Sequence, residues 1–111
     1  MTMSTHVLDT ALGRPAEGIG VRLEILRDTT WESISCSSTN EDGRTRPLPD
    51  GVELEAATYR ITFDVEGYFE RLQTEGFYPY ASIVFRVADP SQHYHVPLLL
   101  SPFGYSTYRG S

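Results

Sequence analysis

The chain has 111 residues, the length of one domain, so we expect a single domain over residues 1–111. Fifteen acidic residues against nine arginines give a formal charge of −6, which disfavours nucleic acid and anionic membranes as partners, and the absence of lysine excludes Schiff-base chemistry. The sequence has neither the roughly 18 consecutive apolar residues of a membrane helix nor the basic and apolar start of a signal peptide, which predicts a cytoplasmic protein.

Strand periodicity dominates the sequence and predicts an all-β fold. Turn residues interrupt the chain at intervals of about eight to twelve residues, which is the spacing of a β-sandwich or barrel. The clearest strand alternates apolar residues, from Tyr59 to Val65, with polar ones, so that one face is buried and the other faces water. In chain order, about eight strands are predicted at residues 4–10, 21–25, 31–37, near Arg44, 59–66, 81–87, 93–100 and 104–108.

One short amphipathic helix is predicted among these strands. Apolar residues between Tyr68 and Leu72 recur at helical spacing with charges around them, which places the helix around residues 67–75. Pro97 has no amide hydrogen to donate, so its strand must lie at an edge there or turn this position away from a ladder. Cys36 has no partner for an internal disulfide, and its position on a strand predicts a packed or half-buried thiol.

Three histidines and one arginine are the residues best suited to chemistry. His93 and His95 stand two residues apart on a predicted strand and so project from one face, which together with His6 gives the composition of a three-histidine zinc site. Alternatively, His6 and His95 act as general acid and base, and Arg44, directly after a turn, stabilises a developing negative charge. The residues alone leave both interpretations open, and the simplest interpretation of His93 is a solvent-facing edge histidine.

Separate segments along the chain together resemble a known family. They are residues 4–10 (STHVLDT) with 13–16 (GRPA), 39–44 (TNEDGR), 93–102 (HYHVPLLLSP) and 104–111 (GYSTYRGS). In this order they resemble the 5-hydroxyisourate hydrolases, the transthyretin-related enzymes of purine breakdown. The resemblance spans essentially the whole chain and implies a transthyretin-like sandwich of two sheets with one short helix, in agreement with the strands and helix predicted from periodicity.

The resemblance also implies a site and a reaction. It implies that His6, Arg44 and His95 are catalytic, and that the residues binding substrate are these three with Tyr108 and Ser111. The implied reaction is the hydrolysis of 5-hydroxyisourate to 2-oxo-4-hydroxy-4-carboxy-5-ureidoimidazoline, in which water attacks the ring carbonyl without a metal or another cofactor. The resemblance does not decide which histidine is the base, and it assigns no role to His93.

An assembly and a rival function complete these expectations. The family resemblance implies a homotetramer, a dimer of dimers, with the active sites in its central channel. The rival is a carrier similar to transthyretin, in which the channel holds an apolar aromatic ligand without catalysis. The polar residues implied for the channel argue against a carrier, because each polar group that is buried without a partner costs roughly 1–3 kcal/mol.

Overall fold

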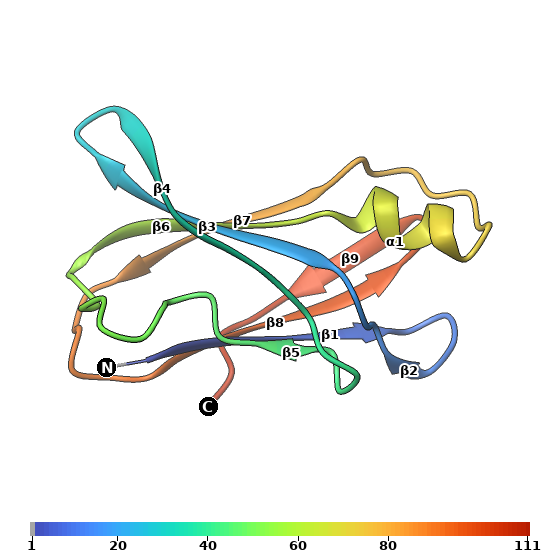
Figure 1. Ribbon diagram of the computed structural model, residues 1–111, viewed down its shortest axis with the longest axis horizontal. Coiled ribbons are helices and arrows are strands. Elements are labelled where there is room, and N and C mark those ends of the chain that lie inside the picture. The colour runs from blue at the N-terminus through green and yellow to red at the C-terminus, as the bar shows by residue number, and fades with distance from the viewer. Residues whose placement is uncertain (1) are drawn as a thin grey trace.

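Two β-sheets lie face to face in the computed structural model, which describes residues 2–111, and one helix lies at one end of them (Figure 1). The five-stranded sheet contains β1 (Met3–Asp9), β2 (Arg14–Pro15), β5 (Arg44–Thr45), β8 (Tyr94–Ser101) and β9 (Gly104–Thr107). The four-stranded sheet contains β3 (Gly20–Arg27), β4 (Thr30–Ser38), β6 (Ala57–Phe63) and β7 (Ala81–Val87). The prediction of a two-sheet sandwich with one short helix is confirmed.

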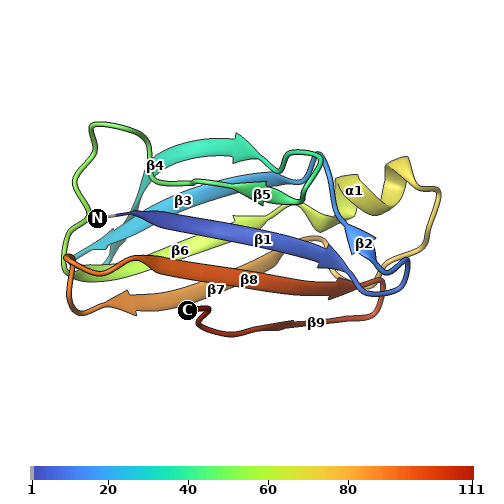
Figure 2. The ribbon, with the colours of Figure 1, turned by 90° about the horizontal axis from the view of Figure 1, so that it is seen from below.

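The five-stranded sheet joins the two ends of the chain. Its strand order is β2-β1-β8-β9, with β5 paired to β1, and Figure 2 shows β5, β1, β8 and β9 side by side in front of the other sheet. β1 and β8 run parallel, from Met3 opposite Tyr94 to Asp9 opposite Leu100. This pairing brings residues that are about 90 positions apart in the sequence into direct contact.

Alternation along these strands separates a core face from an outer face. In β1 the odd-numbered residues from Met3 to Asp9 are buried between the sheets, whereas Ser4 and His6 are half-buried on the outer face. In β8 the even-numbered residues from Tyr94 to Leu100 are buried between the sheets, and His95 is half-buried on the outer face. Burying the apolar face stabilises the sandwich by about 25 cal/mol per Å² of apolar surface removed from water. The outer face of the same sheet, which carries Ser4, His6 and His95, is left for chemistry.

The helix α1 (Val65–Arg71) begins earlier than the sequence predicts. The carboxylate of Asp64 accepts a hydrogen bond from the backbone N–H of Gly67 at 3.1 Å and so caps the first turn. The helix then ends with Leu72 as its C-terminal cap. The prediction of a strand as far as residue 66 was therefore wrong at its end, and the helix predicted around 67–75 has different bounds. The reason is that the side chain of Asp64 caps the helix at a position that the alternation assigns to the strand.

Other local differences follow from pairings between distant strands. β8 lies between β1 and β9, and its ladder with β9 covers Leu98 to Ser101. Pro97 therefore lies just outside that ladder, although it is opposite His6 in the ladder with β1. Beyond the end of the β9 ladder, the carbonyl of Pro97 accepts a hydrogen bond from the Thr107 hydroxyl at 2.7 Å. Cys36 is exposed on β4, which lies at the edge of its sheet, and the prediction of a packed or half-buried thiol was wrong.

The helix of this fold is short compared with a membrane-spanning helix. α1 has seven residues, and within residues 2–111 no helix is long and apolar enough to cross a bilayer.

Candidate active site

The outer face of the five-stranded sheet brings the two histidines of interest onto neighbouring strands. Residues opposite each other in neighbouring strands share a face, and β1 pairs Ser4 with His95 and His6 with Pro97. His6 and His95 therefore project from the same side of the sheet, displaced by two register positions along the strands. Both side chains are half-buried, so they are partly withdrawn from water and still open to a ligand.

Arg44 reaches this face through a tight turn over residues 40–43. The Asn40 side-chain oxygen accepts hydrogen bonds from the backbone N–H groups of Asp42 and Arg44, at 2.9 and 3.0 Å. The Gly43 carbonyl then accepts one from Val7 at 2.7 Å, which anchors the turn to β1. β5 starts at the next residue and pairs Arg44 directly with His6. The structure thus brings the predicted arginine opposite the first predicted histidine.

The turn depends on glycine at one position. Gly43 has a φ of +73°, a conformation that favours glycine, and a Cβ atom there would lie 2.4 Å from the carbonyl oxygen of Val7. No other residue fits without moving β5 away from β1.

The electrostatic surroundings of His95 favour its neutral form. Burial lowers the pKa of His95 from its usual value, and the positive charge of Arg44 lowers it further, followed by smaller effects of His6 and His93. These effects also show that all four residues lie in one electrostatic neighbourhood. A neutral imidazole can accept a proton from water, so His95 has the protonation state that a general base needs near neutral pH.

Two pockets adjoin this group of residues. Arg44 lines a pocket of about 490 Å³ together with Ser4, Asn40, Arg46 and His93. His95 lines a pocket of about 340 Å³ that it shares with Tyr108 and with apolar residues of β7. Tyr108 is 58% exposed and lies just after the end of β9. The structure therefore brings His6, Arg44 and His95 together on one face, and Tyr108 joins them through the pocket on the His95 side.

The C-terminal residues return to the site. The backbone N–H of Gly110 donates to the carbonyl of His95 at 2.8 Å, in an isolated antiparallel bridge. A Cβ atom on Gly110 would lie 2.4 Å from Cδ2 of the His95 ring, so only glycine allows this close approach. Ser111, the last residue, follows directly and is exposed. Its backbone is thereby held near His95.

Two further residues belong to this neighbourhood and were not singled out as catalytic or substrate-binding from the sequence. The Ser4 hydroxyl lies 2.8 Å from Nδ1 of His95 and 3.0 Å from Nε2 of His93. A serine on a strand carries no sequence signal of such a role, and only the register of β1 against β8 reveals it. In the part of the chain that the structure describes, no three His, Cys, Asp or Glu side chains are arranged as a set that could hold a metal ion.

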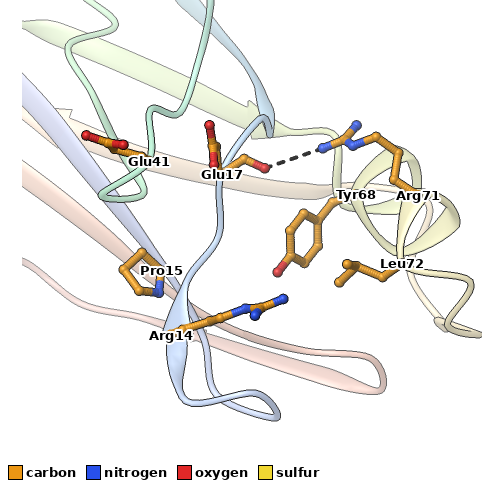
Figure 3. A pocket seen from close by; sticks show the side chains of 7 residues that line it. All are labelled: Arg14, Pro15, Glu17, Glu41, Tyr68, Arg71 and Leu72. Carbon is orange, nitrogen blue, oxygen red and sulfur yellow. Dashed lines mark hydrogen bonds between the residues drawn. The ribbon is translucent and has the colours of Figure 1, made fainter.

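A separate pocket of about 460 Å³ lies beside α1, away from these histidines (Figure 3). Arg14 and Arg71 extend on two sides of Tyr68, whose hydroxyl donates to the buried Asp9 at 2.7 Å. Arg71 is already engaged, because it donates to the carbonyl of Gly18 at 2.8 Å. This pocket contains none of the predicted site residues.

Comparisons with known proteins show what the chain is similar to. The sequence model described as the HIUase/Transthyretin family matches residues 3–110. The 5-hydroxyisourate hydrolase of Mus musculus is 45% identical over 111 residues, which cover 98% of this chain and 94% of that protein.

Solved structures with the same fold include both an enzyme and a carrier. The structure of Klebsiella pneumoniae 5-hydroxyisourate hydrolase matches with a TM-score of 0.85 and 38% identity, and the match covers 100% of both chains. Sea bream transthyretin in complex with thyroxine matches with a TM-score of 0.91 and 28% identity, over 99% of this chain and 95% of that one. Fold similarity alone therefore does not separate the two activities. The match of the family's sequence model over nearly the whole length shows that this chain belongs to the HIUase/transthyretin family.

Proposed function

We propose that this chain, as a single domain over residues 1–111, hydrolyses 5-hydroxyisourate to 2-oxo-4-hydroxy-4-carboxy-5-ureidoimidazoline in urate degradation. Relatives named 5-hydroxyisourate hydrolase are 40–46% identical over nearly all of this chain. The observation that carries the proposal is the convergence of His6, Arg44 and His95 on one face of one sheet. Rigid strands hold such groups more exactly in place than loops do.

In the proposed mechanism, His95 acts as the general base. Its neutral imidazole takes a proton from water, and the water oxygen attacks the ring carbonyl. The guanidinium of Arg44 stabilises the negative charge that develops on the carbonyl oxygen, a role in which loss of one donor costs about 100–1,000-fold in rate. The adjacent C–N bond then breaks, and the proton that His95 took up passes to the leaving nitrogen with the assistance of His6, so that His95 is neutral again for the next turnover. The lowered pKa of His95 supports its assignment as the base.

Substrate binding is assigned to the same three residues together with the C-terminal ones. Tyr108 lines the pocket beside His95, and its phenol is suited to hydrogen bond a heteroatom of a flat ring. Ser111 directly follows Gly110, which bridges to His95, and this neighbourhood supports a place for Ser111 at the wall of the site. We also propose that the protein works in the cytoplasm as a homotetramer, a dimer of dimers whose central channel contains the sites.

The decisive experiment follows the ultraviolet absorbance of freshly generated 5-hydroxyisourate. A hydrolase accelerates its decay at substoichiometric protein concentration, whereas a carrier leaves the decay rate unchanged at that concentration. A matched Arg44→Ala variant must lose most of the acceleration, because it lacks the charge that stabilises the reacting oxygen. If wild-type protein leaves the decay rate unchanged, the hydrolase assignment is wrong.

The same assay tests the absence of a metal from the proposed mechanism. Activity should survive treatment with EDTA, because the proposed steps use only imidazole and guanidinium groups. Activity that is lost with EDTA and restored by zinc would contradict this mechanism and favour a site built from His6, His93 and His95.

A further inference from the structure

A hydrogen-bonded chain of four side chains leads from the surface to His95. The Ser4 hydroxyl lies between two imidazole rings, 2.8 Å from Nδ1 of His95 and 3.0 Å from Nε2 of His93. The hydroxyl of Thr2 contacts the other nitrogen of His93, Nδ1. The order is therefore Thr2, His93, Ser4 and His95. Ser4 lies in β1 and His95 in β8, and Thr2 and His93 each lie one residue before the start of these strands.

The number of protons on each group limits the directions of the hydrogen bonds in this network. A serine hydroxyl has one proton, so Ser4 donates to only one of the two rings and accepts from the other. If Ser4 donates to Nε2 of His93, its oxygen accepts from an Nδ1–H of His95, and Nε2 of a neutral His95 is unprotonated. If Ser4 donates to Nδ1 of His95, Nε2 of that neutral ring must carry the proton. The ring that receives the Ser4 hydrogen therefore decides which nitrogen of neutral His95 is free to act as a base. If His93 receives it, the free nitrogen of His95 is Nε2.

We propose that Ser4 and His93 are positioning residues that hold neutral His95 with its proton on Nδ1, so that Nε2 accepts the proton of the attacking water. This inference rests on the proposed hydrolase function for its catalytic consequence. Nδ1 is the ring nitrogen occupied by Ser4, and residues 2–111 provide no hydrogen bond to Nε2 of His95. The Gly110 backbone packs against Cδ2, the ring carbon bonded to Nε2, and so fixes the ring from the side of the free nitrogen.

The proposed arrangement also suits the charged form of His95 during turnover. When Nε2 takes up a proton, Nδ1–H still donates to the Ser4 oxygen, so the network needs no rearrangement. A partner that holds a catalytic histidine in the correct tautomer and orientation is a recurrent device, and its loss affects rate far more than fold. Here a neutral serine and a second histidine fill that role.

The test combines kinetics with nuclear magnetic resonance of the imidazole nitrogens in the full chain. The variants are Ser4→Ala, which removes the bridging hydroxyl, and His93→Leu, which removes its acceptor. Ser4→Thr keeps a hydroxyl and His93→Gln keeps a group able to accept from Ser4. Ser33→Ala, an exposed serine on β4 of the other sheet, is the control for the loss of a strand hydroxyl.

The nitrogen measurement is made at about pH 8, where a histidine ring is neutral. We expect wild-type His95 to carry its proton on Nδ1, and Ser4→Ala and His93→Leu to shift it toward Nε2. In the same two variants kcat should fall by about 10-fold with KM little changed, the lower end of the usual cost of losing a residue that orients a ligand or base. Ser4→Thr, His93→Gln and Ser33→Ala should retain both the wild-type tautomer and most of the rate.

Specific outcomes overturn the inference. It is wrong if wild-type His95 carries its proton on Nε2, or if Ser4→Ala keeps the wild-type kcat and tautomer. A wild-type protein that does not hydrolyse 5-hydroxyisourate contradicts the proposed function instead. The nitrogen spectrum then still decides whether Ser4 and His93 set the tautomer of His95.

Discussion

His95 is a half-buried histidine whose surroundings favour the neutral ring. Burial lowers its pKa, and Arg44 adds a repulsive positive charge to the protonated form. A base must be neutral to accept a proton, so the role proposed for His95 implies activity that is present above its pKa and is lost as the pH falls through it. At this scale the structure supports a division of labour in which His95 accepts the proton and Arg44 stabilises charge.

The pH profile of activity checks this assignment. Because the pKa of His95 lies below the usual value of 6.5, we expect kcat/KM to hold through neutral pH and to fall only on the acid side of that usual value. The measurement is the initial rate from about pH 5 to 8, with circular dichroism at each pH to show that the fold persists. An acid limb centred above the usual histidine value would contradict the assignment.

Single substitutions separate the three histidines. His6→Ala and His95→Ala should each lower kcat by about 100-fold or more, the size of a general acid or base contribution, while the fold and assembly persist. His93→Ala should lower kcat less, because His93 acts on His95 through Ser4. Steady-state kinetics on the three variants decides the order. Equal damage from His93→Ala with an intact fold would mean that the catalytic residues are wrongly chosen.

At the scale of elements, the turn over residues 40–43 is the device that presents Arg44. Its hydrogen bonds involve the Asn40 side chain, the backbone of the turn itself and the backbone of β1, and Gly43 adopts a positive φ in it. Strand β5 has only two residues, so little besides this turn holds it in register. The position of the arginine is thus set by four residues that themselves do no chemistry.

A glycine-to-alanine pair tests the turn. Gly43→Ala should destabilise the protein by about 1–3 kcal/mol and lower activity, because it combines a strained φ with a Cβ atom 2.4 Å from the Val7 carbonyl oxygen. Gly51→Ala is the matched control, since Gly51 has a φ of +83° but open space around it. Thermal unfolding and kcat are measured for both. If the two variants lose equal activity, the turn does not position Arg44.

The C-terminal segment is a second element with a testable role. A tail after the last strand is ordinarily frayed and tolerant of removal, but here Gly110 bridges to His95. Deleting residues 108–111 should abolish most hydrolysis, and a tag after Ser111 should impair it, while the melting temperature changes little because the core ends before them. Full activity in the truncated protein would show that His6, Arg44 and His95 suffice.

A point substitution refines the same prediction without removing Tyr108 or Ser111. Gly110→Ala should mimic much of the deletion, because its Cβ atom would meet the His95 ring at 2.4 Å. Gly104→Ala is the control, since the nearest atom to a Cβ there is 3.8 Å away. Rates for both variants, compared with their melting temperatures, separate a local effect on the ring from a loss of stability.

At the scale of the whole molecule, the outer face of the five-stranded sheet is incompletely covered in a single chain. Leu8 and Leu99 are half-buried on that face beside the histidines. Apolar side chains around polar ones are typical of a surface that another subunit covers. A second sheet facing this one would enclose the site and limit its water, which is consistent with the proposed tetramer.

Assembly is therefore the prediction at this scale. Sedimentation equilibrium should give four times the chain mass of 12.5 kDa, and the hydrolytic activity should sediment with that species. Leu99→Glu, placed on the outer face, should weaken assembly because it adds charge to a surface that another subunit would bury. Leu12→Glu, an exposed leucine in the turn after β1, is the control. A monomeric protein with full activity would contradict the proposed channel.

The sequence by itself determined the class of fold and the identity of the chemical groups. Alternation with period two is a local property of the chain, so the strands and the sandwich could be predicted from it, and the family resemblance that named His6, Arg44 and His95 is confirmed at the level of the family. The ends of the strands and of the helix were predicted less well, because local side-chain hydrogen bonds compete with the alternation. Asp64 reads as a strand residue in the alternation, but its carboxylate caps α1.

Only the tertiary structure decided how these groups meet. Ser4 and His95 are 91 residues apart, and their contact depends on the register between β1 and β8, which no local pattern encodes. The same holds for the bridge from Gly110 to His95 and for the exposure of Cys36 on an edge strand. Residue types follow from the sequence, whereas packing of the whole core fixes the register of strands that are distant in the chain. A slip of one residue would turn every side chain of a strand to the opposite face.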